Sequence, residues 1–529
     1  MITVIVPGYG SGSYKVAAGD ARRRIADLTS SSGADQVPPT HSLRILDLKS
    51  DERHAPLFPE RGDAFFHKFK FWEQALVESE DQFFLHLDAD ASITSNFSAE
   101  DLINALGAKS IGMVQQKKVI GENPLGIDEL FEHYQSASSK AVNSGQPKPT
   151  IENFKYFNTG FVLFRREALE TFLLWANEKL KTLPREVNGN MIADQDLIQV
   201  YTNEIEPDEV IELDWSWNHC QWWDEDFPNQ DANVIHMSNF CQGPIAAQMN
   251  RLAVLSRGLK AEVFNDLTVV MVTHNSSTVL KESLAALLEI PGLQIVIADN
   301  NSEEIPSSNL SPRIRVIAND TNLGYARAIN AAIPKVTTKY ICLLNPDAFL
   351  TYESTLEAIG KLRENPDQLL APNHVDRNGN FTPSLRDGYP LSRLIDDLFP
   401  KPNSLIRKVA DRALGSSEGK SFHWLIGACV FSSKDFLQTI GGLDESYFLY
   451  MEDVELGKRV QNKGSVASLE SSILHLGAQS TSKSAAFVSK ELSDARLKYL
   501  RRNFGYWPWM VAKALHSSSM LLKKVPRGR

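Results

Sequence analysis

The sequence predicts an α/β protein built from two domains of the same architecture. The chain has 529 residues, which is more than one hydrophobic core usually serves. Short β-branched segments such as "LTVVMV", "LQIVIADN" and "YICLLN" alternate with amphipathic stretches such as "STVLKESLAALLEI", a pattern that favours a mostly parallel sheet. Segments of the first half also recur in the same order in the second half, which indicates an internal repeat.

The repeat is seen in five pairs of segments. "MITVIVPGYG" resembles "DLTVVMVTHN", and "FFLHLDADASIT" resembles "YICLLNPDAFLT". "NTGFVLFRREALETF" resembles "IGACVFSSKDFLQTI", with Gly160 and Gly427 in comparable places, and "ADQDL" and "MEDVEL" follow. "VIHMSN" and "ILHLGAQS" each place a histidine after an apolar residue. We therefore expect domains at 1–260 and 266–500, followed by a basic amphipathic tail at 501–529.

Composition and charge narrow the class of protein. With 43% hydrophobic and 23% charged residues the chain is globular, and a net charge of −10 argues against general nucleic-acid binding. The chain opens on a strand rather than a signal peptide, and no run of about 18 apolar residues occurs. We expect a cytoplasmic protein.

The end of the chain is basic and aromatic. Ten Lys or Arg residues against two acids lie between 490 and 529, together with Tyr506, Trp507 and Trp509. This mixture suits an interfacial helix at the cytoplasmic face of the inner membrane. The alternative is a helix packed on the domain, followed by a frayed basic tail.

Two pairs of polar residues follow buried strands at equivalent places in the repeat. Asp88 and Asp90 follow "FFLHL", and Asn345 and Asp347 follow "YICLL". Two bare carboxylates about 4 Å apart would repel by about 4 kcal/mol at an effective dielectric near 20. Mn²⁺ or Mg²⁺ on such a pair reverses that sign and keeps positions open for the phosphate oxygens of a nucleotide sugar. A late histidine can complete each site, although a satisfied core histidine is the alternative. The candidate metal ligands are Asp88, Asp90, His236, Asp347 and His475.

The second half resembles the inverting glycosyltransferases of family 2, closest to rhamnosyltransferase-like bacterial members. The resemblance rests on "VVMVTHNSSTVLKESLAALL", "VIADNNS", "NDTNLGYARAINAAI", "YICLLNPDAFLT", "GACVFSSKDFLQTIGGLDESYFLYMEDVELGKR" and "ILHLGAQS". It implies a GT-A (Rossmann-like) fold with Asp347 on the metal, Asp453 as the general base and Glu452 in support. Asp453 as a mere helix cap is the alternative. Asn-Pro-Asp offers one anionic ligand where Asp-x-Asp offers two, which predicts weaker or dispensable metal binding. The implied donor-binding residues are Thr273, Asn275, Asp299, Asn301, Asn322, Gly324, Arg327, Asn330 and Asn345.

The first half resembles the GT-A fold more generally. "FNTGFVLF", "DQDL", "LDWSWN" and "VIHMSNFCQGP" are most similar to retaining transferases of the family 8 type. That resemblance implies manganese on Asp88, Asp90 and His236. It places Asp194, Gln195 and Asp196 near the reacting carbon as catalytic candidates.

Four further candidate residues complete the set. "GYGSGS" does not match G-x-G-x-x-G and is interpreted as a nucleotide-contacting loop, so Pro7, Tyr9 and also Asp88 are expected to bind the donor. Trp222, in "SWNHCQWWDEDF", and Trp424 are the candidate acceptor-binding aromatics. For Trp222, partial burial in the core is the alternative.

We expect a bifunctional glycosyltransferase that uses UDP-, GDP- or dTDP-sugars, with dTDP-rhamnose suggested for the second domain by the resemblance alone. Its two domains would extend a lipid-linked glycan into a bacterial surface polysaccharide such as O antigen or capsule. The alternative is one active C-terminal transferase beside a non-catalytic, acceptor-binding N-terminal domain.

Overall fold

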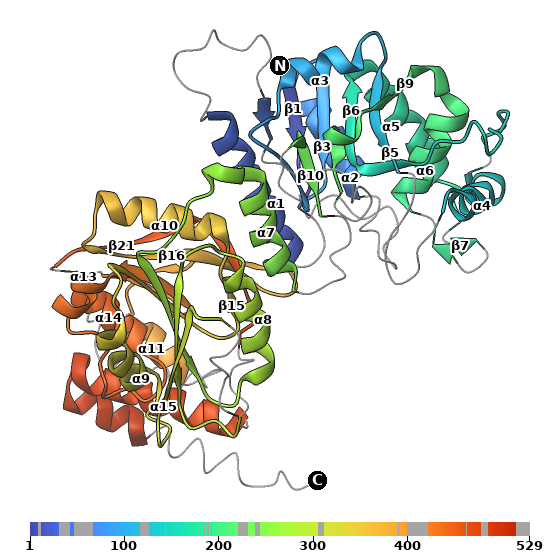
Figure 1. The fold of residues 1–529 in the computed structure, drawn as a ribbon. Coiled ribbons are helices and arrows are strands. Elements are labelled where there is room, and N and C mark those ends of the chain that lie inside the picture. The colour runs from blue at the N-terminus through green and yellow to red at the C-terminus, as the bar shows by residue number, and fades with distance from the viewer. Residues whose placement is uncertain are drawn as a thin grey trace, which may run out of the picture. The chain divides into compact units, whose positions relative to one another are not determined.

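The chain divides into two compact units, Met1–Ala261 (unit 1) and Glu262–Arg529 (unit 2) (Figure 1). Among the residues described below, no helix is both long and apolar enough to cross a membrane. The computed structural model describes residues 1–8, 12–30, 43–46, 67–116, 126–142, 144–184, 186–187, 190–191, 193–220, 231–237, 244–304, 311–389, 391–398, 422–461, 463–477 and 485–514.

Unit 1 contains a six-stranded sheet in which one strand opposes the others. Across the sheet the strands are β2 (Leu43–Ile45), β1 (Ile2–Ile5), β3 (Phe83–Leu87), β6 (Phe157–Arg165), β5 (Ile111–Gln115) and β9 (Val210–Leu213). β6 is antiparallel to β3 and β5, and the remaining pairs are parallel. Two antiparallel ribbons are separate from it: β4 (Ala91–Ile93) with β10 (Val234–His236), and β7 (Glu186–Val187) with β8 (Asn190–Met191).

Helices cover both faces of this sheet, because successive side chains of a strand point to opposite sides. In β3, Phe84 joins one core cluster and Leu85 joins the other. On the Phe84 face lie α2 (His67–Glu78), α4 (Ile127–Ala137), α5 (Arg166–Leu180) and α6 (Asp194–Val200). On the Leu85 face lie α1 (Gly12–Ser30), α3 (Ala99–Leu106) and α7 (Ile245–Arg257). The short helical turns are η2 (Ser138–Val142), η3 (Tyr201–Ile205), η4 (Pro207–Glu209), η5 (Trp215–Asn218) and η7 (Gly258–Lys260).

Unit 2 contains a nine-stranded sheet. Its main order is β13 (Ile314–Ala318), β12 (Gln294–Asp299), β11 (Leu267–Thr273), β14 (Tyr340–Leu344), β20 (Cys429–Ser433), β16 (Gln368–Val375), β21 (Ser465–His475) and β15 (Ala348–Phe349). β17 (Phe381–Thr382) pairs with β16, and β18 (Leu385–Asp387) forms a separate hairpin with β19 (His423–Leu425). β20 is antiparallel to both of its neighbours.

Most helices of unit 2 pack against its sheet. α9, α13 and α14 share one buried apolar cluster with the sheet, while α8 contacts β15 and α10 contacts β16 and β21. The helices are α8 (Ser277–Leu288), α9 (Tyr325–Ala332), η9 (Ile333–Lys335), α10 (Tyr352–Glu364), α11 (Leu391–Leu398), α13 (Lys434–Thr439), α14 (Glu452–Val460) and α15 (Ala485–Phe504). Because α15 continues to Phe504, the predicted start of the tail at residue 501 falls inside this helix. A further helix covers 506–514.

The two sheets repeat one strand order. β2-β1-β3-β6-β5-β9 of unit 1 corresponds to β12-β11-β14-β20-β16-β21 of unit 2, with the antiparallel strand in the same place. The register at the histidines also agrees, because His236 lies opposite Ala91 and His475 lies opposite Ala348.

One detail of the expected repeat is wrong by one residue. The backbone N–H of Asp88 donates to the Gly160 carbonyl, and that of Asn345 donates to the Ala428 carbonyl. The counterpart of Gly160 is therefore Ala428 rather than Gly427, because strand register and not the residue type defines equivalence.

Candidate functional site

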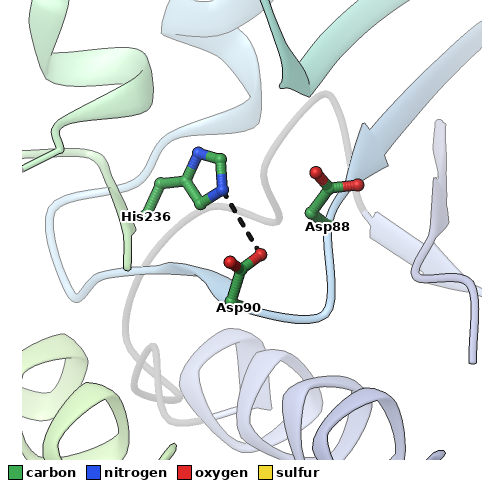
Figure 2. A group of neighbouring side chains, drawn as sticks. All are labelled: Asp88, Asp90 and His236. Carbon is green, nitrogen blue, oxygen red and sulfur yellow. Dashed lines mark ion pairs between the residues drawn. The ribbon is translucent and has the colours of Figure 1, made fainter. Parts of the chain in front are cut away.

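Unit 1 gathers three of the predicted metal ligands. Asp88 follows β3, Asp90 precedes β4, and His236 ends β10, which pairs with β4. One ligand atom of each residue lies within 4.8 Å of the others, and His236 Nε2 is 3.3 Å from Asp90 Oδ1 (Figure 2). Two carboxylates and an imidazole suit Mn²⁺, so these residues fit the predicted ion.

The imidazole of His236 is oriented by a chain of side-chain amides. Asn218 Nδ2 donates to Asn158 Oδ1 at 3.0 Å, so the Asn218 oxygen is left to accept the His236 Nδ1–H at 3.1 Å. That assignment leaves Nε2 facing the carboxylates, as a metal-binding histidine requires. The ring also packs on Gly160, where a Cβ would lie 2.1 Å from His236 Cε1.

Lys68 is a buried cation beside the carboxylates. Its Nζ is 2.7 Å from Asp194 Oδ2 and 3.5 Å from Asp88 Oδ1. His86 contacts the carboxylate of Asp88. Trp72 Nε1–H donates to His86 Nδ1, which leaves the His86 Nε2–H to donate to Asp88 Oδ1 at 2.9 Å. Burial alone would raise the pKa of Asp88, but Lys68 and His86 lower it well below its usual range. Asp88 is therefore anionic.

The Asp194-Gln195-Asp196 segment forms the start of α6, and each of its side chains contacts a different partner. Burial raises the pKa of Asp194, although Lys68 opposes that effect. Gln195 Oε1 accepts from Thr159 Oγ1 at 3.3 Å. Asp196 Oδ2 accepts the Ala193 N–H at 2.8 Å, and its Oδ1 is 3.0 Å from His133 Nε2. Of the three, Asp194 is linked to the metal candidates through Lys68, while Asp196 caps its helix.

Unit 2 has a cavity of about 380 Å³ at the carboxyl ends of its central strands, where ligands bind in open α/β sheets. Thr273 ends β11, Asn300 follows β12 and Asn345 follows β14. The predicted site residues that line the cavity are Thr273, Asn322, Gly324, Asn345, Asp347, Glu452, Asp453 and His475.

The predicted metal side of the cavity holds Asp347 and His475. Their Oδ1 and Nε2 atoms are 3.7 Å apart, and Asp347 is buried. Burial lowers the pKa of His475. Behind it lies the ring of His374, with 5.0 Å between the ring centroids. Burial and the neighbouring His475 lower the pKa of His374 to about 3, so that ring is neutral.

The acidic side of the cavity holds Glu452 and Asp453 at the start of α14. Tyr450 and Met451, just before them, have φ angles of +71° and +69°, a strained left-handed conformation for residues other than glycine. Asp453 accepts the Val454 N–H at 2.8 Å and the Gly427 N–H at 3.2 Å.

The two carboxyls differ in charge. Burial, with a contribution from Asp453, raises the pKa of Glu452 to about 8, and burial also raises the pKa of Asp453. At neutral pH Glu452 is therefore mostly protonated, so it adds little negative charge beside Asp453, the predicted general base.

Other predicted residues of unit 2 do not line the cavity. Asp299 accepts the Ser302 N–H at 3.0 Å, and Asn275 Oδ1 accepts the Glu303 N–H at 2.8 Å. Asn330 exchanges hydrogen bonds with the backbone of Leu443. Trp424 is 7% exposed and donates its indole N–H to the Gly388 carbonyl, so it offers little surface to an acceptor. The set is Asn275, Asp299, Asn301, Arg327, Asn330 and Trp424.

In unit 1, Pro7 is buried just after β1. Tyr9 and Trp222 lie outside the described residues. Sequence reasoning missed Lys68, which lies in none of the quoted segments, and it did not single out His86 within "FFLHL" or Asn218 within "LDWSWN". It also missed Asn300. Asn300 lines the cavity and donates its amide to the Gly324 carbonyl at 3.1 Å.

Comparison with known proteins adds an independent finding. Residues 268–416 match the family model described as glycosyl transferase family 2. The chain is 27% identical over 297 residues to an N-acetylglucosaminyl-diphospho-decaprenol L-rhamnosyltransferase of Mycobacterium tuberculosis, covering 50% of this chain and 95% of that protein. It is 24% identical over 251 residues to the O-antigen biosynthesis protein RfbC of Myxococcus xanthus, covering 44% of this chain and 18% of that protein.

Among solved structures, the chain is similar to the mannosyltransferase PcManGT from Pyrobaculum calidifontis in complex with GDP-Man and Mn²⁺. The TM-score is 0.31 at 13% identity, over 50% of this chain and 76% of that one. A similarity this low supports no conclusion by itself.

Proposed function

The protein is a glycosyltransferase with a family 2 domain in unit 2, and from this premise we propose that unit 2 transfers a sugar from a nucleotide-diphospho-sugar to an acceptor hydroxyl with inversion. One observation carries the proposal. The Asp347–His475 pair and the Glu452–Asp453 pair line the same cavity, so ligands for a diphosphate-bound cation and a base for the acceptor face one space.

Each side chain has a role in this reaction. Asp453, held by two backbone N–H groups, takes the proton from the attacking hydroxyl. Glu452 is protonated and does not add a second charge. Thr273, Asn322 and Gly324 contact the donor. Asp347 and His475 would hold Mn²⁺ or Mg²⁺, which when bound supplies positive charge for the departing diphosphate.

The substrates of unit 2 are proposed from the two relatives. We take the donor to be a deoxysugar nucleotide, dTDP-rhamnose, and the acceptor to be a lipid-linked glycan of a bacterial surface polysaccharide. The names of the mycobacterial and myxococcal proteins support rhamnose, a lipid-linked acceptor and an O-antigen product, while the dTDP carrier follows the family resemblance alone. Such an acceptor would place the reaction at the cytoplasmic face of the inner membrane.

The test is transfer by the purified chain to a synthetic lipid-diphosphate N-acetylglucosamine, with dTDP-rhamnose and with UDP- and GDP-sugars. Asp453→Asn is expected to lower kcat by about 10²- to 10⁴-fold, while Glu452→Gln keeps most activity at pH 7. If no donor releases its nucleotide with any acceptor, the proposal is overturned.

We also propose that unit 1 is a second GT-A transferase, retaining in stereochemistry, that extends the same glycan. Its support is the Asp88, Asp90 and His236 cluster together with the repeated strand order. The competing function is a non-catalytic, acceptor-binding module. Asp90→Ala and Asp453→Asn variants are compared for each linkage formed. Loss of one linkage in each variant supports two transferases, and full activity of Asp90→Ala overturns the second one.

A further inference from the structure

Three large apolar side chains are exposed together just after α15. Tyr506 is 54% exposed, Trp507 73% and Met510 41%. They belong to the helix at 506–514, where spacings of three and four residues put side chains on one face. We call these three residues the aromatic face. Exposed apolar clusters of this kind mark contact surfaces.

The opposite side of the same helix is anchored in unit 2. Ala512 is buried in a core cluster with Tyr499 and Leu500, and Trp509 packs partly against that cluster. Gly505, with φ of +95°, adopts the left-handed conformation that ends α15 and turns the chain. The aromatic face is therefore presented by a packed helix.

Exposed cations lie beside the aromatic face. The Arg501 guanidinium is 4.9 Å and the Lys513 ammonium 4.8 Å from the centroid of the Trp509 ring. Lys498 lies over the ring of Tyr447 at 5.6 Å, and Arg502 lies over the same ring at 6.0 Å but is also ion-paired with Asp444. The chain as a whole carries a net charge of −10, so this positive region is opposite in sign to the rest of the molecule.

We propose that the aromatic face and its cations dock unit 2 on an anionic lipid surface. Trp and Tyr rings settle at the level of the headgroups, and Lys and Arg attract anionic phospholipids. A second copy of the chain is the poorer occupant, because a symmetric contact would bring Arg501 and Lys513 against the same cations of the partner. The inference rests on the proposed function only in that a lipid-linked acceptor gives the docking a purpose.

The same helix system reaches the cavity. Phe487, near the start of α15, lines the cavity that contains Asp453, and α15 has 20 residues. A helix of that length spans about 30 Å. Docking through the aromatic face thus holds the cavity within about one helix length of the headgroups, where a lipid-carried acceptor is presented.

The experiment is cosedimentation of the full chain with vesicles of phosphatidylcholine alone or mixed 3:1 with phosphatidylglycerol. We expect the chain to bind the anionic vesicles more tightly, with affinity falling as salt is raised. The triple variant Tyr506→Ser, Trp507→Ser, Met510→Ser is expected to lower the partition coefficient about tenfold or more. Arg501→Gln with Lys513→Gln is expected to remove the preference for anionic vesicles.

Matched controls come from unit 1. Leu174 is 72% and Val77 84% exposed, and changing both to Ser is expected to leave vesicle binding unchanged. Vesicle binding by the triple variant equal to that of the original chain overturns the proposal. So does a dimer in sedimentation equilibrium that the triple variant abolishes, since the face would then bind a second copy. Sugar transfer to a water-soluble acceptor should be equal in the triple variant and the original chain. This assay therefore detects a failure of the proposed function independently of vesicle binding.

Discussion

At the scale of single residues, Gly160 shapes the predicted metal site by lacking a side chain. A Cβ at this position would lie 2.1 Å from Cε1 and 2.8 Å from both ring nitrogens of His236, so Gly160→Ala must displace the ring. We expect Mn²⁺ affinity of unit 1 to fall about 10- to 100-fold, measured by calorimetry in an Asp347→Asn background. Gly19→Ala in α1, where the nearest atom is a flexible Arg23 nitrogen at 3.5 Å, is the control. Unchanged Mn²⁺ affinity in Gly160→Ala would show that His236 is not a ligand.

Lys68 places one positive charge between the carboxyl groups of Asp88 and Asp194. Lys68→Met leaves the buried Asp194 and the half-buried Asp88 without that charge, and we expect unit 1 to lose about 3 kcal/mol of unfolding free energy. Added Mn²⁺ should raise the melting temperature of this variant more than that of the original protein. Lys70→Met, which breaks an i,i+3 surface pair with Glu73, should cost about 1 kcal/mol or less. Equal stabilisation by Mn²⁺ in both proteins would argue against a site at Asp88.

Glu452 makes the stability of unit 2 depend on pH. Its pKa rises from the ordinary 4.5 to about 8 on folding, so its stabilising contribution is complete below pH 4.5 and is lost as pH rises toward 8. Glu452→Gln removes that loss. We expect it to add about 3 kcal/mol at pH 7 and little at pH 4.5, measured by urea unfolding. The exposed Glu282 on α8, changed to Gln, should have little effect at either pH. An equal gain from Glu452→Gln at both pH values would contradict the burial argument.

At the scale of elements, the turn into α9 depends on Gly324. Its φ is +81°, and a Cβ there would lie 2.5 Å from the Phe448 carbonyl oxygen. Gly324→Ala is expected to destabilise unit 2 by about 1–3 kcal/mol and to weaken donor binding. In the interior of α10, a Cβ added at Gly360 would meet no atom within 4 Å, so Gly360→Ala should stabilise by about 0.5–1 kcal/mol. Thermal unfolding and nucleotide titration measure both. If Gly324→Ala and Gly360→Ala change the stability in the same direction, the argument from the backbone conformation of Gly324 is wrong.

The sequence predicted the site residues that follow strands, but not those that other helices and turns contribute. Strand ends followed by paired acids placed Asp88 and Asp90 together, and a repeat placed His236 with them, because a buried strand delivers its last residues to one sheet edge. Lys68 and Asn218 reach the same place from α2 and η5, which local pattern does not encode. Asp299 and Asn301 were expected at the donor, yet Asn300 lines the cavity, since the side-chain direction after a strand depends on the turn.

At the scale of the whole molecule, each unit has its own buried clusters and its own sheet. A chain comprising residues 262–529 alone should therefore fold, unfold in one cooperative transition and retain nucleotide binding with unchanged affinity. Circular dichroism and calorimetry on this fragment and on the full chain provide the comparison. A fragment with no cooperative transition would mean that unit 2 needs unit 1 in order to fold.

The strands that carry the two histidines differ in one respect. In unit 2 a single strand, β21, pairs with β16 and then with β15, so His475 sits at the end of a continuous ladder. In unit 1 two separate strands make the corresponding pairings, since β9 pairs with β5 and β10 pairs with β4. The turn η5, which contains Asn218, lies between β9 and β10 in the sequence. Natural variation can thus lengthen or replace the joint in unit 1 while the sheet stays intact. An insertion within β21 would break its ladder. Diversification among homologues should therefore concentrate between β9 and β10 rather than within β21, with Asn218 excepted because it orients His236.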